Sequence, residues 1–235
     1  MADISNREQV EKKIARALSK DQQAQLNRLI KQLGNPPNLN NIPQSMWDDI
    51  GKNTAVVLSP FLEEVFLNQA KEIMRSIPIG IDWTLINQGA VDWASRYSFD
   101  LVSHLNQTSR NGLSQAIQAY FRDAGTIGNL ESRISAYEQF TRRAGNLFGP
   151  VRAETIAITE VTRAAAQGEI AIAEDIKKQG IEMIASWNTN QDESTCPLCS
   201  PLNNKKQGDG WTEPPPLHPR CRCWINHELP KVRRG

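Results

Sequence analysis

All four cysteines of this 235-residue chain lie between Cys196 and Cys223, and the 195 residues before them contain none. His218 lies inside the same stretch. Disulfides that stabilise secreted domains usually join cysteines spread along a chain, whereas a tight group of cysteines beside a histidine is typical of a metal site. The spacing therefore predicts that the end of this chain folds around a metal ion.

The pattern of the cluster favours zinc as a structural cofactor. Cys196 and Cys199 form a C-x2-C pair, and a gap of 18 residues separates them from His218, Cys221 and Cys223. Structural zinc sites commonly hold the ion in a tetrahedron of four sulfur and nitrogen ligands. A small, proline-rich segment has little core of its own, and bound metal supplies the missing stability. The alternatives are a disulfide and cysteines that only pack in the interior.

The second pair of ligands has two solutions. Cys221 and Cys223 are two residues apart, so on an extended strand their β-carbons would be roughly 6–7 Å apart, too far for a small ion to bridge comfortably. We therefore expect Cys196, Cys199 and His218 to bind the ion, with either Cys221 or Cys223 as the fourth ligand. The spare cysteine would be a buried thiol or a group that contacts one of the ligands, and His227 is a weak reserve ligand.

The chain before the cluster is expected to be mainly α-helical, because its apolar residues recur at helical spacing. Residues 1–45 read as an N-terminal helical arm and a Pro- and Asn-rich linker, and residues 46–149 as a helical bundle. Within the bundle we expect separate helices, one of them opened by Ser59-Pro60, a shorter one around Leu113, and a last one from about Asn129.

Residues 150–235 are expected to form a small α+β zinc-binding module. Gly149-Pro150 begins a helix that reaches about Gln179. Apolar and polar residues then alternate from Ile181 to Trp187, which indicates a strand.

The N-terminal helix is the candidate docking element of the chain. Its apolar positions are sparse, and the linker after it has little to bury. A helix of this kind is marginal alone and would be stabilised in the groove of a partner. The alternative is that it folds back onto its own bundle.

Charge and hydrophobicity limit the other partners. No apolar run approaches the ~20 residues that a membrane span requires, and the charged start lacks a signal core, so we expect folding in a cytosol. The net charge of +1 is low for a dedicated DNA-binding protein. Beyond Asn203, however, the sequence contains seven basic and three acidic residues, an excess of four positive charges that can bind phosphates non-specifically. The basic residues are Lys205, Lys206, Arg220, Arg222, Lys231, Arg233 and Arg234.

The motifs of zinc enzymes are missing from this sequence. A zinc deaminase needs H-x-E before P-C-x-x-C, and a metalloprotease needs H-E-x-x-H, but neither occurs here. Three histidines are also too few for an HNH-type nuclease. Four protein ligands leave no open position for water, so we expect no enzymatic activity. Arg152, Glu154, Glu160 and Arg163 could form a carboxylate–arginine set, but docking of this helix face onto the zinc module is favoured.

A longer pattern links the cysteine cluster to the helix before it. An Arg-, Thr- and Glu-rich helix from Arg152 to Arg163 is followed by Trp187, a D-x-x-T-C-x-x-C turn and a P-P-L-H-P-x-C-R-C segment. In this order, residues 150–228 closely resemble the phage Mu protein F family of minor head proteins. The positions that match are Asp192, Thr195, Cys196, Cys199, Pro215, His218, Pro219, Cys221, Arg222 and Cys223.

The resemblance implies a minor capsid protein of a tailed phage. It would act in head morphogenesis, with a role in DNA packaging or ejection, and its partners would be the portal protein, the major capsid protein, or both. Such a protein is made in the host cytoplasm and resides in the virion, in the capsid interior or at the portal vertex. Non-specific contact with packaged DNA is the alternative role, and a zinc-dependent enzyme is a further one.

Overall fold

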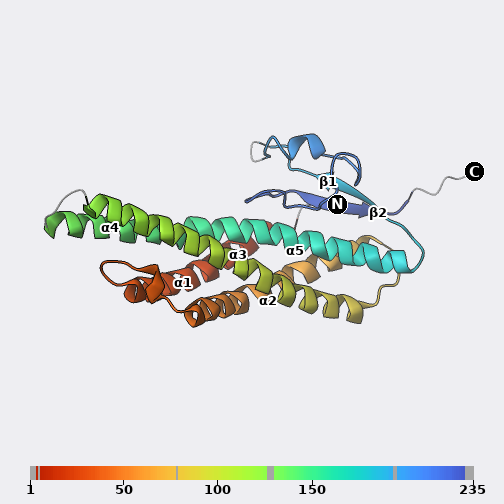
Figure 1. Ribbon diagram of the computed structural model, residues 1–235. Coiled ribbons are helices and arrows are strands. Elements are labelled where there is room, and N and C mark those ends of the chain that lie inside the picture. Colours follow the sequence, from red (N-terminus) through yellow and green to blue (C-terminus); the bar gives the residue numbers. More distant parts are fainter. Residues whose placement is uncertain (1–3, 5, 78, 126–129, 193–194, 231–235) are drawn as a thin grey trace, which may run out of the picture. The chain divides into compact units, whose positions relative to one another are not determined.

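The computed structural model describes residues 4, 6–77, 79–125, 130–192 and 195–230, and the described part is mainly helical, as predicted (Figure 1). The helices are α1 (Arg7–Leu33), α2 (Gln44–Ser76), α3 (Trp83–Gly125), α4 (Leu130–Leu147) and α5 (Pro150–Lys178), with 3-10 turns at Leu39–Asn41 and Ser200–Leu202. Strands β1 (Ile184–Asn188) and β2 (Trp224–Glu228) form an antiparallel sheet.

Two predicted helix boundaries are wrong. Pro60 lies inside α2 rather than opening a helix, and the residues around Leu113 continue α3 instead of forming a separate helix. The sequence between Leu105 and Leu113 is polar, which interrupts the apolar stripe, but it contains no proline that would end the helix. The helix therefore continues through this stretch. Asn129, where we expected the last bundle helix to begin, lies outside the described residues.

The chain forms two compact units, and each unit is assembled from separate stretches of the sequence. One unit contains residues 1–13, 59–95 and 155–235, and the other contains residues 14–58 and 96–154. The helices α1, α2, α3 and α5 each contribute residues to both units. These four helices therefore run through both units.

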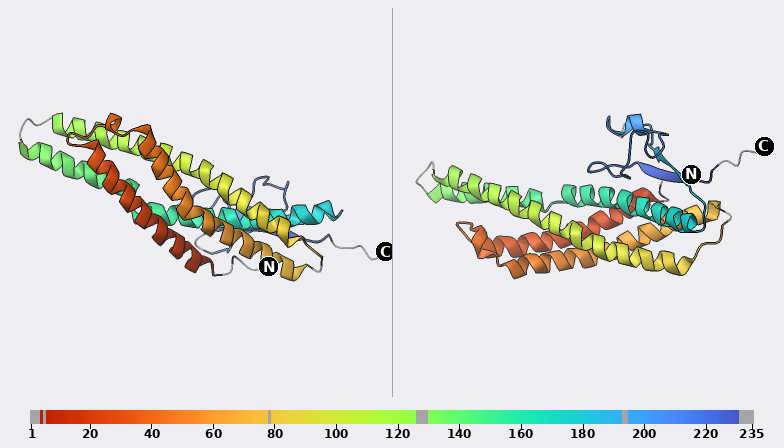
Figure 2. Two further views of the ribbon diagram at one scale, coloured as in Figure 1. Left: turned by 90° about the horizontal axis from the view of Figure 1, so that it is seen from below. Right: turned by 45° about the vertical axis from the view of Figure 1, so that its right-hand side comes forward.

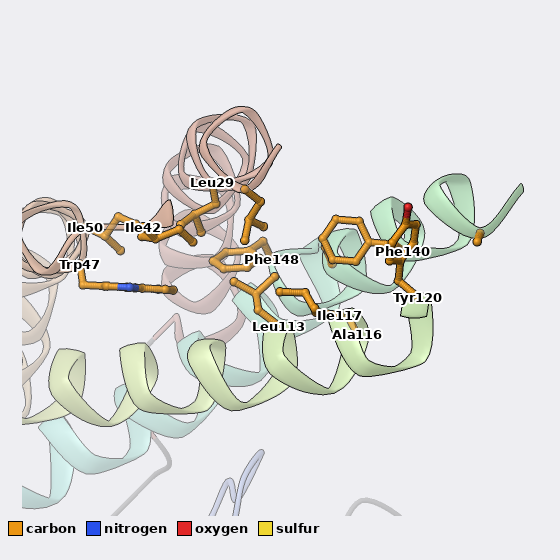
Figure 3. Close-up of a cluster of buried hydrophobic side chains, with 13 residues drawn as sticks. Leu29, Ile42, Trp47, Ile50, Leu113, Ala116, Ile117, Tyr120, Phe140 and Phe148 are labelled. Carbon is orange, nitrogen blue, oxygen red and sulfur yellow. The ribbon is translucent and has the colours of Figure 1, made fainter. Parts of the chain in front are cut away.

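The unit of residues 14–58 and 96–154 is a helical assembly around an aromatic and aliphatic core. Figure 3 shows Leu113 and Ile117 of α3 facing Phe148 and Phe140, with Trp47 and Leu29 farther along the same row. Tyr120 meets the ring of Phe140 edge-on at 6.3 Å between centroids.

The N-terminal helix is an integral part of this core, so the expectation of a sparsely packed docking arm is wrong. Ile14, Leu18, Leu29 and Leu33 of α1 are fully buried. Gln25 also donates a buried hydrogen bond of 2.7 Å to the Thr54 hydroxyl of α2. The apolar residues of α1 are few, but they are spaced so that almost all fall on one face. The alternative, a helix folded back onto its own bundle, is confirmed.

The unit of residues 1–13, 59–95 and 155–235 contains the sheet. The second halves of α2 and α5 pack closely at Gly168, where an added β-carbon would lie 2.4 Å from the carbonyl oxygen of Phe66. The predicted strand is confirmed as β1, although it begins at Ile184 rather than at Ile181. It pairs with β2 in a register that places Trp187 opposite Ile225. Figures 1 and 2 show the sheet and its loops lying along the second half of α5.

Candidate metal centre

The first two candidate ligands are presented by a tight turn. The amide of Cys199 donates to the carbonyl of Cys196 at 3.1 Å, and the amide of Ser200 donates to the same carbonyl at 3.0 Å. These bonds bring both sulfurs to one side of the loop. Behind the turn, the chain returns to pair with β1, where the amide of Trp187 donates to the carbonyl of Lys205 at 2.8 Å.

The second turn presents His218 and Cys221. The amide of Cys221 donates to the carbonyl of His218 at 3.2 Å, and Arg220 between them adopts a positive φ of 63°. The Nδ1 atom of His218 lies 2.8 Å from the carbonyl oxygen of Pro219. A carbonyl at that distance favours the tautomer with the proton on Nδ1, which leaves the lone pair of Nε2 free to bind a metal.

Several distances among these side chains are close to those around a tetrahedral ion with soft ligands. Around zinc, two thiolates lie about 3.8 Å apart, and a thiolate and an imidazole nitrogen lie about 3.6 Å apart, given the usual bond lengths. The Sγ atoms of Cys199 and Cys221 are 3.8 Å apart. The Nε2 atom of His218 is 3.3 Å from Cys199 Sγ and 2.9 Å from Cys196 Sγ. Both nitrogen–sulfur distances are shorter than the ideal, by about 0.3 Å and 0.7 Å, so binding would require the imidazole to move away from the two sulfurs.

All five predicted ligands are brought together, in two groups that share Cys199. One group consists of Cys196, Cys199 and His218, and the other of Cys199, Cys221 and Cys223; within each group the ligand atoms lie within 4.8 Å of one another. The described part of the chain thus offers one candidate more than a tetrahedral ion needs. None of the four cysteines, all of which are described, forms a disulfide.

The thiols of the cluster differ in their tendency to ionise. A hydrogen bond from the Cys223 thiol lowers the pKa of Cys221 to about 5, against the opposing effect of burial. Burial, together with the neighbouring charge of Cys221, raises the pKa of Cys199 to about 12. The hydrogen bond to Cys221 and burial raise the pKa of Cys223. A divalent cation binds thiolates, so loading this site would expel protons, chiefly from Cys199.

Helix α5 supports the second turn through two threonines. The backbone amide of Arg220 donates to Thr159 Oγ1 at 2.9 Å, and Thr162 Oγ1 donates to the carbonyl of Cys221 at 2.6 Å. Residues three apart lie on one helix face, so both hydroxyls hold consecutive residues of the ligand turn. The predicted packing of this helix against the segment that carries the candidate ligands is confirmed.

The charged residues of α5 have other partners. Arg152 donates to Ser109 Oγ at 2.9 Å and to the carbonyl of Leu105 at 3.0 Å, whereas Glu160 forms an ion pair of 3.3 Å with Arg163 on its own helix. These contacts of Arg152 and Glu160 thus lie within the helices, whereas Thr159 and Thr162 contact the ligand turn.

Two residues of α1 that the sequence interpretation missed also contact the second turn. Arg222 donates to the carboxylate of Glu11 with both Nε, at 3.3 Å, and Nη2, at 2.6 Å. Arg7 donates to Thr162 Oγ1 at 3.2 Å and to the carbonyl of Arg222. A signal was available: Arg7 and Glu11 continue the face of Ile14 and Leu18 at helical spacing, so the buried face of α1 begins with two charges.

His227, the reserve ligand, is engaged elsewhere. Its Nδ1 atom lies 3.2 Å from Glu169 Oε2, and Gln69 donates to the other carboxylate oxygen at 3.0 Å. All three side chains are buried. His227 therefore anchors β2 to α5 and α2 and belongs to neither ligand group.

The basic residues near the site include several that are already bound. Arg222 pairs with Glu11, and Lys205 forms an exposed ion pair of 3.4 Å with Asp209. Lys231, Arg233 and Arg234 lie outside the described residues.

Residues 116–226 match the family described as Phage Mu protein F like protein. No curated protein and no solved structure matches the chain. The matched region runs from the second half of α3 into β2 and includes all five candidate ligands. Over the described residues, no helix is long and apolar enough to cross a membrane.

Proposed function

We propose that the chain is a minor head protein of the phage Mu protein F-like family, that it is not an enzyme, and that its C-terminal module is stabilised by one zinc ion. The observation that carries the metal assignment is the meeting of two ligand turns, with 3.8 Å between Cys199 Sγ and Cys221 Sγ and 3.3 Å between Cys199 Sγ and His218 Nε2. The sulfur–sulfur distance matches that of a tetrahedral zinc site, and the sulfur–nitrogen distance is about 0.3 Å shorter than in such a site.

The ligand set that we propose is Cys196, Cys199, His218 and Cys221. Cys221 is preferred over Cys223 because its sulfur lies at the thiolate–thiolate distance from Cys199 and because its backbone closes the turn with His218. Cys223 then donates a hydrogen bond to the Cys221 sulfur as a neighbouring thiol. Bound zinc would cross-link the turns that begin at Cys196 and at His218 and so stabilise the fold of this segment.

A structural role follows from the composition of the site. Four protein ligands fill the tetrahedron and leave no position for a substrate or an activated water. Cys199 and Cys221 are each only 1% exposed, so a substrate would have no access to these two sulfurs. These features support the absence of catalysis.

The family implies capsid or portal partners and a place in the virion. We propose more specifically that the protein associates with the portal protein, the major capsid protein, or both, in the capsid interior or at the portal vertex. It would be made in the host cytoplasm and act in head assembly and in the packaging or ejection of DNA. Cryo-electron microscopy of mature heads, with and without this gene, tests the assignment: the expected result is density at the portal vertex that is lost with the gene, and identical maps would refute it.

The metal is tested on the purified full-length protein. Elemental analysis should find about one zinc per chain, and Cys196→Ser or His218→Ala should lower that content sharply. His104→Ala is the matched control, because His104 is an exposed histidine in the middle of α3. Wild-type protein that contains no zinc after expression in zinc-supplemented medium would refute the metal centre.

A further inference from the structure

The start of α1 carries two buried charges. Arg7 is 6% exposed and Glu11 is 3% exposed, although charged side chains are almost never buried to this degree unless they are paired. By contrast, Glu8 and Lys12 on the opposite side of the same turns form an ordinary surface pair, with side chains that are 72% and 68% exposed. The two buried charges therefore need a specific partner whose interactions offset the free energy of desolvation.

That partner is the segment between two of the candidate thiols. Both oxygens of Glu11 accept hydrogen bonds from Arg222, which lies between Cys221 and Cys223 in the sequence and 211 residues from Glu11. This is the two-pronged geometry in which guanidinium and carboxylate bind most strongly.

Arg7 reaches the same segment from the other side. It donates to the carbonyl of Arg222 and to Thr162 Oγ1, and the Thr162 hydroxyl in turn donates to the carbonyl of Cys221 at 2.6 Å. A chain of hydrogen bonds thus runs from α1 through α5 to the backbone that carries the Cys221 sulfur.

We propose that Arg7 and Glu11 are positioning residues of the metal centre, and that zinc binding is thermodynamically coupled to the seating of the first two turns of α1. The pair fixes residues 221 and 222, so that Cys221 faces Cys199. This inference rests on the proposed zinc centre. Groups that orient metal ligands commonly account for about 10–100-fold in metal affinity, and coupling between two sites acts equally in both directions.

The forward direction is tested by zinc affinity. Glu11→Gln keeps the size of the side chain and removes its charge, and Glu8→Gln makes the same change at the exposed pair one turn away. In competition with a chromophoric chelator, Glu11→Gln should bind zinc about 10–100-fold more weakly than wild type, while Glu8→Gln should bind as wild type does. Equal affinities for Glu11→Gln and wild type would overturn the coupling.

The reverse direction needs no variant, so it stays decisive if Glu11→Gln fails to fold. Hydrogen–deuterium exchange of the wild-type protein is compared with and without a chelator. Removing zinc should speed exchange in peptides that cover the start of α1 more than in peptides from the second half of α2, which belongs to the same compact unit. Exchange at the start of α1 that does not respond to zinc would overturn the coupling while the metal centre stands. A wild-type protein that binds no zinc would instead overturn the metal centre, and this inference with it.

Discussion

Removing the hydroxyl of Thr162 tests whether α5 holds the turn that carries His218 and Cys221. Thr162 is 1% exposed; its oxygen accepts a bond from Arg7 at 3.2 Å and donates one to the Cys221 carbonyl at 2.6 Å. Thr162→Val keeps the shape of the side chain and removes both bonds. Bonds to charged groups contribute about 1.5–3 kcal/mol and neutral ones about 1 kcal/mol, so we expect a loss of about 3 kcal/mol.

Thermal unfolding of zinc-loaded protein, followed by tryptophan fluorescence, measures this loss. Trp187 is fully buried beside Trp211, 5.5 Å between ring centroids, and therefore reports on the cysteine module. In a chain of this size 1 kcal/mol lowers Tm by about 2–4 °C, so Tm should fall by about 6–12 °C. Thr108→Val is the control, since the exposed Thr108 bonds only to the carbonyl of His104 in its own helix and should change stability by less than about 0.5 kcal/mol. Equal Tm values for the two variants would refute the argument.

Three further predictions follow from the same contacts. Cys221→Ser should lose zinc far more readily than Cys223→Ser, measured by elemental analysis after dialysis; if His218→Ala keeps zinc while both cysteine variants lose it, a four-cysteine site is correct instead. In chelated protein, the lowered pKa of Cys221 (about 5, against about 8.5 when unfolded) adds stability that is complete above pH 8.5 and lost as pH falls through 5. Melts of wild type and Cys221→Ser should therefore converge near pH 5 and diverge towards pH 8, and a constant difference would contradict this. Gly168→Ala should destabilise by about 1–3 kcal/mol, because its β-carbon would meet the Phe66 carbonyl at 2.4 Å, whereas Gly89→Ala on α3, with open space around it, should stabilise by up to about 1 kcal/mol; urea titrations with the opposite order would reject the packing argument.

The sequence was sufficient for the features that depend on local spacing. The C-x2-C pair, the H-x2-C turn and the alternation before Trp187 each determine a local conformation, and the five predicted ligands do meet. The helical class was equally accessible, because the apolar period persists along most of the chain. The helix boundaries were less accessible: Pro60 is accommodated within α2, and a polar stretch in α3 interrupts the apolar face without ending the helix.

The role of α1 was misjudged because counting apolar residues does not measure burial. The helix has few of them, yet Ile14, Leu18, Leu29 and Leu33 are all completely buried, since their spacing places them on one face. The same face continues into Arg7 and Glu11, which an analysis of apolar periodicity ignores because both are charged.

These two charges also explain why the boundaries of the compact units could not be drawn from the sequence. A buried carboxylate is tolerated only with a matching partner, and the partner of Glu11 is Arg222, 211 residues away. Arg222 can reach it because Thr159 and Thr162 hold the neighbouring residues of the ligand turn on α5. The candidate metal centre is therefore completed by the first helix of the chain, in the unit that joins residues 1–13 to residues 155–235. A fragment beginning at residue 150 would keep every candidate ligand but lose Glu11. The guanidinium of Arg222 would then be left without its carboxylate partner. The segment from Cys221 to Cys223 would lose the contacts with α1 that orient it.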